Sequence, residues 1–147
     1  LVILASEDIG LADPQGLVIA QAAADAVGFI GMPEGRIPLA EATVYLALAP
    51  KSNRAYVAID TAIADVKAGK AGVVPDHLRD AHYPGAKDIG HGTGYAYAHD
   101  APHGVAAQDY LPETLRAERY YEPTDHGLER ALTERLQTIR RLLGRDR

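Results

Sequence analysis

The fold is decided by residues 13–49, which read DPQGLVIAQAAADAVGFIGMPEGRIPLAEATVYLALA. The opening Asp-Pro pair is a helix-start signal, because Asp caps free main-chain N–H groups and Pro is tolerated in a first turn. This predicts a helix over residues 14–27 and, after the turn residues of GMPEGRIP, a second helix over residues 38–49. Both are apolar around most of their circumference. We expect the first to be buried on most sides and the second to be central.

On either side of this stretch the pattern is also helical. Residues 1–9, LVILASEDI, read as the tail of a helix cut from a longer polypeptide, being too apolar for an exposed terminus. A third helix is predicted to run to about Ala68, capped by Ser52 or Asn53 and ended by Gly69 with positive φ. Helical spacing divides its sides into an apolar set, Tyr56, Ile59, Ile63 and Val66, and a solvent-facing set, Asp60, Asp65 and Lys67.

Residues 72–123 are rich in Pro and Gly, and we expect this segment to be irregular but packed down. Short helices are plausible over residues 76–81 and 85–89, and Tyr95 and Tyr97 could form a short β pairing. An amphipathic helix is predicted over residues 125–143. The expected core comprises Leu17, Ile19, Leu39, Leu46, Ile59, Ile63, Leu132 and Leu136.

Composition indicates a soluble intracellular chain of one helical domain, residues 1–147. Without cysteine there is no disulfide framework and no thiolate metal site. Neither a signal peptide nor an apolar run of membrane length is present in the sequence. A net charge of −5 argues against a nucleic-acid-binding surface over the whole domain, although a basic patch remains at the C-terminal end: Arg140, Arg141, Arg145 and Arg147.

Two glycine-containing motifs resemble nucleotide-binding loops only weakly. KAGKAG at residues 67–72 lacks the first Gly and the hydroxyl of a phosphate loop and follows a predicted helix, so a helix C-cap and turn is preferred. GHGTGY at residues 90–95 does not open a helix as a dinucleotide fingerprint would, so it is interpreted as turns.

Histidines crowd the irregular segment at positions 82, 91, 99 and 103. His99 and His103 have the four-residue spacing of zinc ligands on a helix, with Asp100 nearby. Pro102 disfavours that helical geometry, so hydrogen bonds to loop backbone are the preferred interpretation over a metal site.

Other polar groups have structural explanations as well. Glu7 and Asp8 point about 100° apart on a helix, so an acid/base pair is disfavoured and Asp8 is expected to bind nearby backbone. Asp76, His77 and Arg79 could form a polar site at a helix N-terminus, or Arg79 could pair with Asp80 or a distant Glu. No nucleophilic arrangement is defined.

Four segments in order resemble one family: LVILASEDIGLADP, APKSNRAY, VPDHLRDAHYPGAK and GYAYAHDAPHGVAAQDYLPE. The chain looks like the C-terminal region of the RarA/MgsA AAA+ ATPases of replication and recombination, whose relatives include the Werner-helicase-interacting ATPases. The chain departs from the pattern at Ala96, Ala98 and Ala101. The positions that match the family pattern are Ser6, Glu7, Asp8, Gly10, Asp13, Pro14, Pro50, Lys51, Ser52, Asn53, His77, Leu78, Arg79, His99 and Asp100.

The resemblance implies an all-α oligomerisation domain, comparable in place to a clamp-loader collar, that forms homotetramers. It implies no catalytic, cofactor or metal residue in this chain, with ATP and magnesium bound by an ATPase domain upstream. Implied partners of the parent protein are single-stranded or forked DNA and single-strand-binding protein, not a membrane. The implied location is the cytoplasm, at the nucleoid.

Two apolar helices in succession support oligomerisation without the resemblance, because a small helical domain cannot bury both completely. The alternative to oligomerisation is that the many alanines raise the apolar content of these helices without creating a surface that binds a partner. Two further functions stay open: docking of DNA or a partner at the basic C-terminal end, and an independent metal-dependent hydrolase built on the histidine segment.

Overall fold

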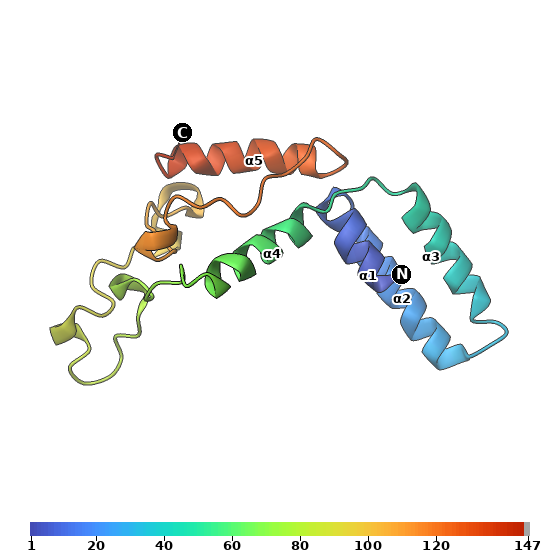
Figure 1. The fold of residues 1–147 in the computed structure, drawn as a ribbon, viewed down its shortest axis with the longest axis horizontal. Helices are drawn as coiled ribbons and strands as arrows, with labels where there is room; N and C mark the ends of the chain where they lie inside the picture. Colours follow the sequence, from blue (N-terminus) through green and yellow to red (C-terminus); the bar gives the residue numbers. More distant parts are fainter. Residues whose placement is uncertain (146–147) are drawn as a thin grey trace. The chain divides into compact units, whose positions relative to one another are not determined.

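The structure is a computed structural model that describes residues 1–145 (Figure 1). Its regular elements are helices, and none of the described residues lies in a β-strand, which confirms the all-α prediction. The chain divides into two compact units. Unit 1 comprises Leu1–Thr61 with Tyr120–Glu134, and unit 2 comprises Ala62–Arg119 with residues 135–145. No described helix is both long enough and apolar enough to cross a bilayer.

Unit 1 is built on a helical hairpin. The short helix α1 (Val2–Leu4) continues into a π-helical turn, Ala5–Ile9, and lies beside α2 (Gln15–Ile30). Helix α3 (Arg36–Leu48) returns along α2 as an antiparallel partner (Figure 1). The central buried cluster comprises Ala5, Ile9, Ala20 and Leu46, with Val2, Tyr45 and Ala49 packed against it.

Small residues let α2 approach this cluster closely. A Cβ atom added to Gly16 would lie 3.3 Å from the side chains of both Ile9 and Leu46. The buried positions of α2 are Gly16, Ala20 and Ala23, so its larger apolar side chains occupy other sides of the helix. The prediction that this helix is buried on most sides is therefore wrong.

The expected core is confirmed only in part. Leu46 is 1% exposed, whereas Leu17, Ile59 and Ile63 are exposed side chains. The remaining four are partly buried: Ile19, Leu39, Leu132 and Leu136. Helical periodicity identifies an apolar side of a helix. It does not show that, where helices pack closely, the buried positions are occupied by Gly and Ala, as they are in α2.

Helix α4 (Arg54–Lys67) begins and ends as predicted. The Arg54 N–H donates to the Ser52 hydroxyl at 3.3 Å, and Gly69 has φ +76°. Asp60 and Lys67 are exposed as predicted. The prediction is wrong for the apolar set, which is exposed, and for Asp65, which is buried and accepts a hydrogen bond from Lys70 Nζ at 2.8 Å. This contact also confirms that KAGKAG forms a helix end and turn.

Unit 2 contains short 3₁₀ turns at Asp76–Leu78, Lys87–Ile89, Ala98–Asp100, Pro102–Gly104 and Glu113–Leu115. The short β pairing at Tyr95 and Tyr97 is wrong. Instead, the Gln108 side chain bonds both main-chain groups of Ala96, accepting at 3.0 Å and donating at 2.8 Å. A side-chain amide thus takes the place of a neighbouring strand.

Helix α5 (Glu129–Leu142) starts four residues later than predicted. Gly127 has φ +49°, and a Cβ there would lie 2.2 Å from the Ala12 carbonyl oxygen. The chain must therefore make a glycine turn before the helix can begin. The predicted basic end of this helix includes Arg147, which lies outside the described residues.

Candidate functional site

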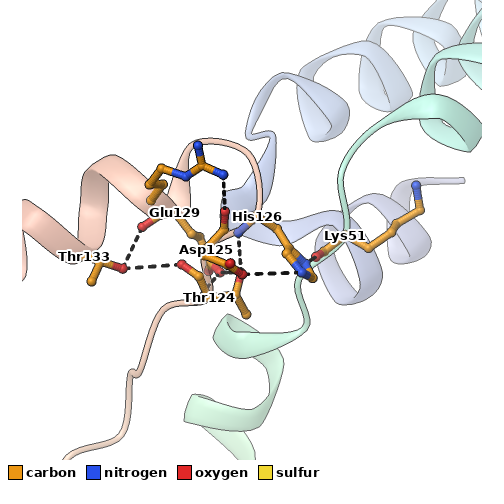
Figure 2. Close-up of polar contacts among 7 residues, drawn as sticks. Lys51, Thr124, Asp125, His126, Glu129 and Thr133 are labelled. Carbon is orange, nitrogen blue, oxygen red and sulfur yellow. Dashed lines mark hydrogen bonds and ion pairs between the residues drawn. The ribbon is translucent and has the colours of Figure 1, made fainter.

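Three segments far apart in the sequence meet in unit 1. The Ser52 N–H donates to the Asp8 carbonyl at 2.8 Å, and the Leu128 N–H donates to the Ala12 carbonyl at 2.8 Å. His126 Nδ1 donates to the Lys51 carbonyl at 2.7 Å (Figure 2). These bonds join segments 6–14, 49–53 and 124–129. Most of the family-pattern positions predicted from the sequence lie in the first two of these segments.

A buried carboxylate, Glu129, lies at the centre of this meeting point and is 0% exposed. Its Oε2 accepts from the Thr124 N–H at 2.8 Å and from the Thr124 hydroxyl at 2.6 Å, and its Oε1 accepts from the Tyr121 hydroxyl at 2.9 Å. Ser52 also donates to it. We call Ser52, Tyr121, Thr124 and Glu129 the Glu129 joint.

The electrostatics of the joint follow from its donors. Burial alone would raise the pKa of Glu129, but the hydrogen bonds from Thr124, Ser52 and Tyr121 outweigh burial and hold it below its ordinary value of 4.5. Burial, together with the hydrogen bond to Glu129, raises the pKa of the Tyr121 hydroxyl above its ordinary value. Glu129 is therefore a stable carboxylate at neutral pH.

The chemistry of the joint is structural. Both oxygens of Glu129 are occupied by donors of the same chain, and no buried side-chain N or O atom within residues 1–145 lacks a hydrogen-bond partner. A proton-transfer group would need an oxygen that faces a substrate. The joint instead ties the start of α5 to the loops before α2 and α4.

Sequence reasoning did not select Tyr121, Thr124 or Glu129. A signal was present, because a Thr followed by a Glu at the start of a helix resembles a capping box, here with a spacing of five residues rather than three. Glu129 is fully buried because segments 6–14 and 49–53 lie against the start of α5. The spacing of residues within segment 124–129 cannot show this.

Other family-pattern residues hold the ends of helices. Asp13 Oδ1 accepts from the Gln15 N–H at 3.1 Å, which confirms the helix-start prediction, and Asp13 Oδ2 accepts from the Tyr45 hydroxyl at 2.7 Å. Lys51 Nζ donates to the Leu46 carbonyl at 2.9 Å and to the Ala49 carbonyl. A cation thus satisfies free carbonyls at the end of α3.

The family-pattern residues near the N-terminus also make hydrogen bonds that involve main-chain groups. The Ser6 hydroxyl donates to the Val2 carbonyl at 3.2 Å, and Asp8 contacts Ser52 through its main-chain carbonyl. Gly10 has φ +52°, and a Cβ there would lie 2.6 Å from the Ser52 carbonyl oxygen. Only glycine lets the two segments approach so closely.

A pocket of about 750 Å³ opens in unit 2, and His77 and Arg79 are among its lining residues. His77 Nε2 donates to the Asp109 carbonyl at 2.8 Å. Arg79 pairs with Asp76 at 3.1 Å and donates to the Val74 carbonyl at 2.8 Å. The structural ion-pair interpretation of Arg79 is therefore confirmed, but the partner is Asp76 rather than Asp80 or a distant Glu.

The four histidines of the irregular segment do not form one cluster. His82 pairs with Asp80 at 2.6 Å, and the His91 ring contacts Tyr83. His99 and His103 lie on separate 3₁₀ turns, and His103 has φ +62°. Within residues 1–145, no three His, Asp or Glu side chains gather closely enough to hold a metal ion.

The hairpin of unit 1 exposes an apolar surface on α3. The buried side of this helix carries Ala42 and Leu46, whereas Ile37, Val44 and Leu48 recur along its opposite side. Val44 is 60% exposed and Leu48 is 81% exposed. At the end of α2, Phe29 is 93% exposed. Helix α3 is thus apolar on two opposite sides, whereas a helix at the surface of a monomer has one apolar side.

The helical unit, with its Glu129 joint and its exposed hairpin, is an all-α structure. Residues 1–140 match the family model described as MgsA AAA+ ATPase C terminal, and the chain belongs to this family.

Similar proteins include an uncharacterised AAA domain-containing protein of Mycobacterium tuberculosis, 52% identical over 100% of this chain and 32% of that protein. Replication-associated recombination protein A of Bacillus subtilis is 49% identical over 86% of this chain and 30% of that protein. ATPase WRNIP1 of Dictyostelium discoideum is 40% identical over 83% of this chain and 14% of that protein. The chain thus spans about a third or less of the length of these relatives.

Proposed function

We infer that this chain is the assembly domain of a AAA+ ATPase that acts in replication-associated recombination. It holds copies of the parent protein together as a homo-oligomer, a tetramer in the family pattern, in a position like that of a clamp-loader collar. The observation that carries this proposal is the double-sided apolar surface of α3, because contiguous exposed apolar residues mark protein contacts.

The parent protein would bind ATP and magnesium in its own ATPase domain and act on single-stranded or forked DNA with single-strand-binding protein, at the nucleoid in the cytoplasm. The name of the Bacillus subtilis relative supports the recombination setting. In this arrangement the chain contributes proximity, because linked ATPase domains meet at a high effective concentration.

A docking role for the basic C-terminal end has weaker support. Arg145 already pairs with Asp109. A net charge of −5 also disfavours electrostatic attraction of DNA to the chain as a whole.

Sedimentation of the chain tests the proposal directly. We expect a mass several times that of the 15.7 kDa monomer at micromolar concentration. In the parent protein, removal of residues 1–147 should leave the ATPase fold intact and reduce DNA-stimulated turnover most strongly at low protein concentration. A chain that stays monomeric, or a truncated parent with unchanged mass and turnover, would contradict the assembly function.

A further inference from the structure

The pocket of about 750 Å³ in unit 2 is bordered by residues 72–75, which follow the end of α4 and belong to no helix or turn. Pro75 favours extended backbone at Val74, because its ring clashes with a helical conformation of the residue before it. Val73 and Val74 are both exposed. An extended segment with exposed β-branched side chains therefore forms one wall of the pocket.

This segment is held at both ends, while the main chain between them is free. The Thr114 hydroxyl donates to the Lys70 carbonyl at 2.7 Å, and Arg79 Nε donates to the Val74 carbonyl at 2.8 Å. The main-chain N–H and C=O groups of residues 71–73 make no hydrogen bond to any other described residue. Free main-chain groups on an extended segment are a template for pairing with a second extended chain.

Close packing at Gly72 fixes the position of the segment. A Cβ atom added to Gly72 would lie 2.8 Å from Pro112 Cβ and 3.0 Å from Thr114 Oγ1. The segment therefore lies directly against residues 112–114. Because it is ordered before any ligand arrives, pairing with it costs less conformational entropy than pairing with a mobile loop.

The charges that line the pocket indicate the sign of its ligand. Arg79 pairs with Asp76 at 3.1 Å, and Arg116 pairs with Asp109 at 2.9 Å. Glu113 is exposed and is the one charged lining residue that forms no ion pair with another described residue. Both lining arginines are already paired, so the uncompensated charge of the pocket is negative. This disfavours an anionic ligand and favours a Lys or Arg side chain.

We propose that this pocket binds an extended basic peptide segment of a partner protein. The peptide main chain pairs with residues 71–73, and one of its Lys or Arg side chains lies against Glu113. Main-chain pairing supplies affinity and the pocket supplies specificity, as in other cases of strand addition. This binding site does not depend on the proposed assembly function, because its residues all lie in unit 2.

The first test changes only the ligand. A fluorescein-labelled peptide, Lys-Val-Lys-Val-Lys-Val, should bind the wild-type chain with a dissociation constant below about 1 mM, measured by fluorescence anisotropy. The same peptide N-methylated at every residue keeps its side chains and charge but donates no main-chain hydrogen bond. It should bind at least about tenfold more weakly.

The second test changes the main chain of the protein at Val73. Val73→Pro removes the N–H group of this residue and should weaken binding of the peptide at least about tenfold. Val73→Thr is the matched control, because it keeps the main chain and a β-branched side chain, and it should bind within about twofold of the wild type. Circular dichroism should show the same helix content for both variants.

The third test reverses the charge of the pocket. Glu113→Lys should weaken binding of the peptide at least about threefold. Asp88→Lys is the matched control, because Asp88 is an exposed acidic residue of unit 2 that does not line the pocket. The control changes the net charge of the chain by the same amount and should bind the peptide more tightly than Glu113→Lys.

Each result decides one part of the proposal. A wild-type chain that does not bind the peptide, or that binds the N-methylated peptide equally well, overturns pairing with residues 71–73. Equal binding by Val73→Pro and Val73→Thr does the same. Equal losses in Glu113→Lys and Asp88→Lys overturn the contact with Glu113. Displacement of the peptide by a six-nucleotide oligothymidine would assign the pocket to nucleic acid and overturn the proposal.

Discussion

Glu129 shows what a single residue does in this fold. Its carboxylate accepts hydrogen bonds from Ser52, Tyr121 and Thr124, donors in two segments that are distant in the sequence. Hydrogen bonds to a charged group are stronger than neutral ones, and a buried donor that loses its acceptor keeps its full desolvation cost. One carboxylate therefore holds the start of α5 against the loop before α4.

Replacing this carboxylate should destabilise the chain. We expect Glu129→Ala to lower the free energy of unfolding by about 2–4 kcal/mol, because the Thr124 and Tyr121 donors lose their acceptor. Chemical denaturation at pH 7 measures this loss. A variant as stable as the wild type would show that the joint does not hold the fold together.

The pH dependence gives an independent check at the same residue. Because hydrogen bonds hold the pKa of Glu129 below 4.5, its charged form stabilises the folded state above pH 4.5. That contribution is lost as the pH falls from 4.5 through the lower folded pKa. The stability difference between wild type and Glu129→Gln should therefore shrink as denaturation is repeated from pH 6 down to pH 3, and a constant difference would contradict the ionised joint.

At the scale of the element, α2 and α3 show how two apolar helices choose their buried sides. Gly16 and Ala20 let α2 approach Ile9 and Leu46, so small residues occupy the contact and large ones are left outside. Close packing of short side chains brings the two backbones together and gains dispersion contacts. The sides that remain exposed are the ones that the proposed assembly would use.

Two leucines that were both expected in the core should differ in how much stability is lost when each is replaced by alanine. Leu46→Ala removes a side chain that is 1% exposed and should lower the free energy of unfolding by about 2–5 kcal/mol. Leu17→Ala removes one that is 43% exposed and should cost less than about 1.5 kcal/mol. Thermal or urea denaturation of both variants measures the contrast, and equal losses would place Leu17 in the core after all.

At the scale of the whole molecule, the chain consists of two compact units, and the hairpin of unit 1 carries an exposed apolar surface. Unit 2 contains short turns, ion pairs and a pocket, at which Asp76 and Asp109 are paired with arginines. Such a molecule fits a role in positioning other domains.

The chain should not bind nucleotide by itself. Its KAGKAG segment forms a helix end and turn rather than a loop that cradles phosphate. We therefore expect isothermal titration with ATP and magnesium to give no saturable heat. Saturable binding at submillimolar concentration would contradict this prediction.

The sequence by itself determined the helical class, the start of α2 at its Asp-Pro signal, the start of α4 after Ser52 or Asn53, and the family. These features are local, because capping and helical periodicity act within a few residues, and the family is recognised from motifs that lie in the sequence itself.

Only the tertiary structure decided which sides of the helices are buried, the role of Glu129 and the inward position of Asp65. The Asp65 side chain was expected to face solvent, yet it is buried and bonded to Lys70. The buried sides of α2 and α3 and the role of Glu129 depend on contacts between segments distant along the chain or on the close approach of packed backbones. The free energy of those contacts, not local propensity, selects among the apolar and polar sides that a helix offers.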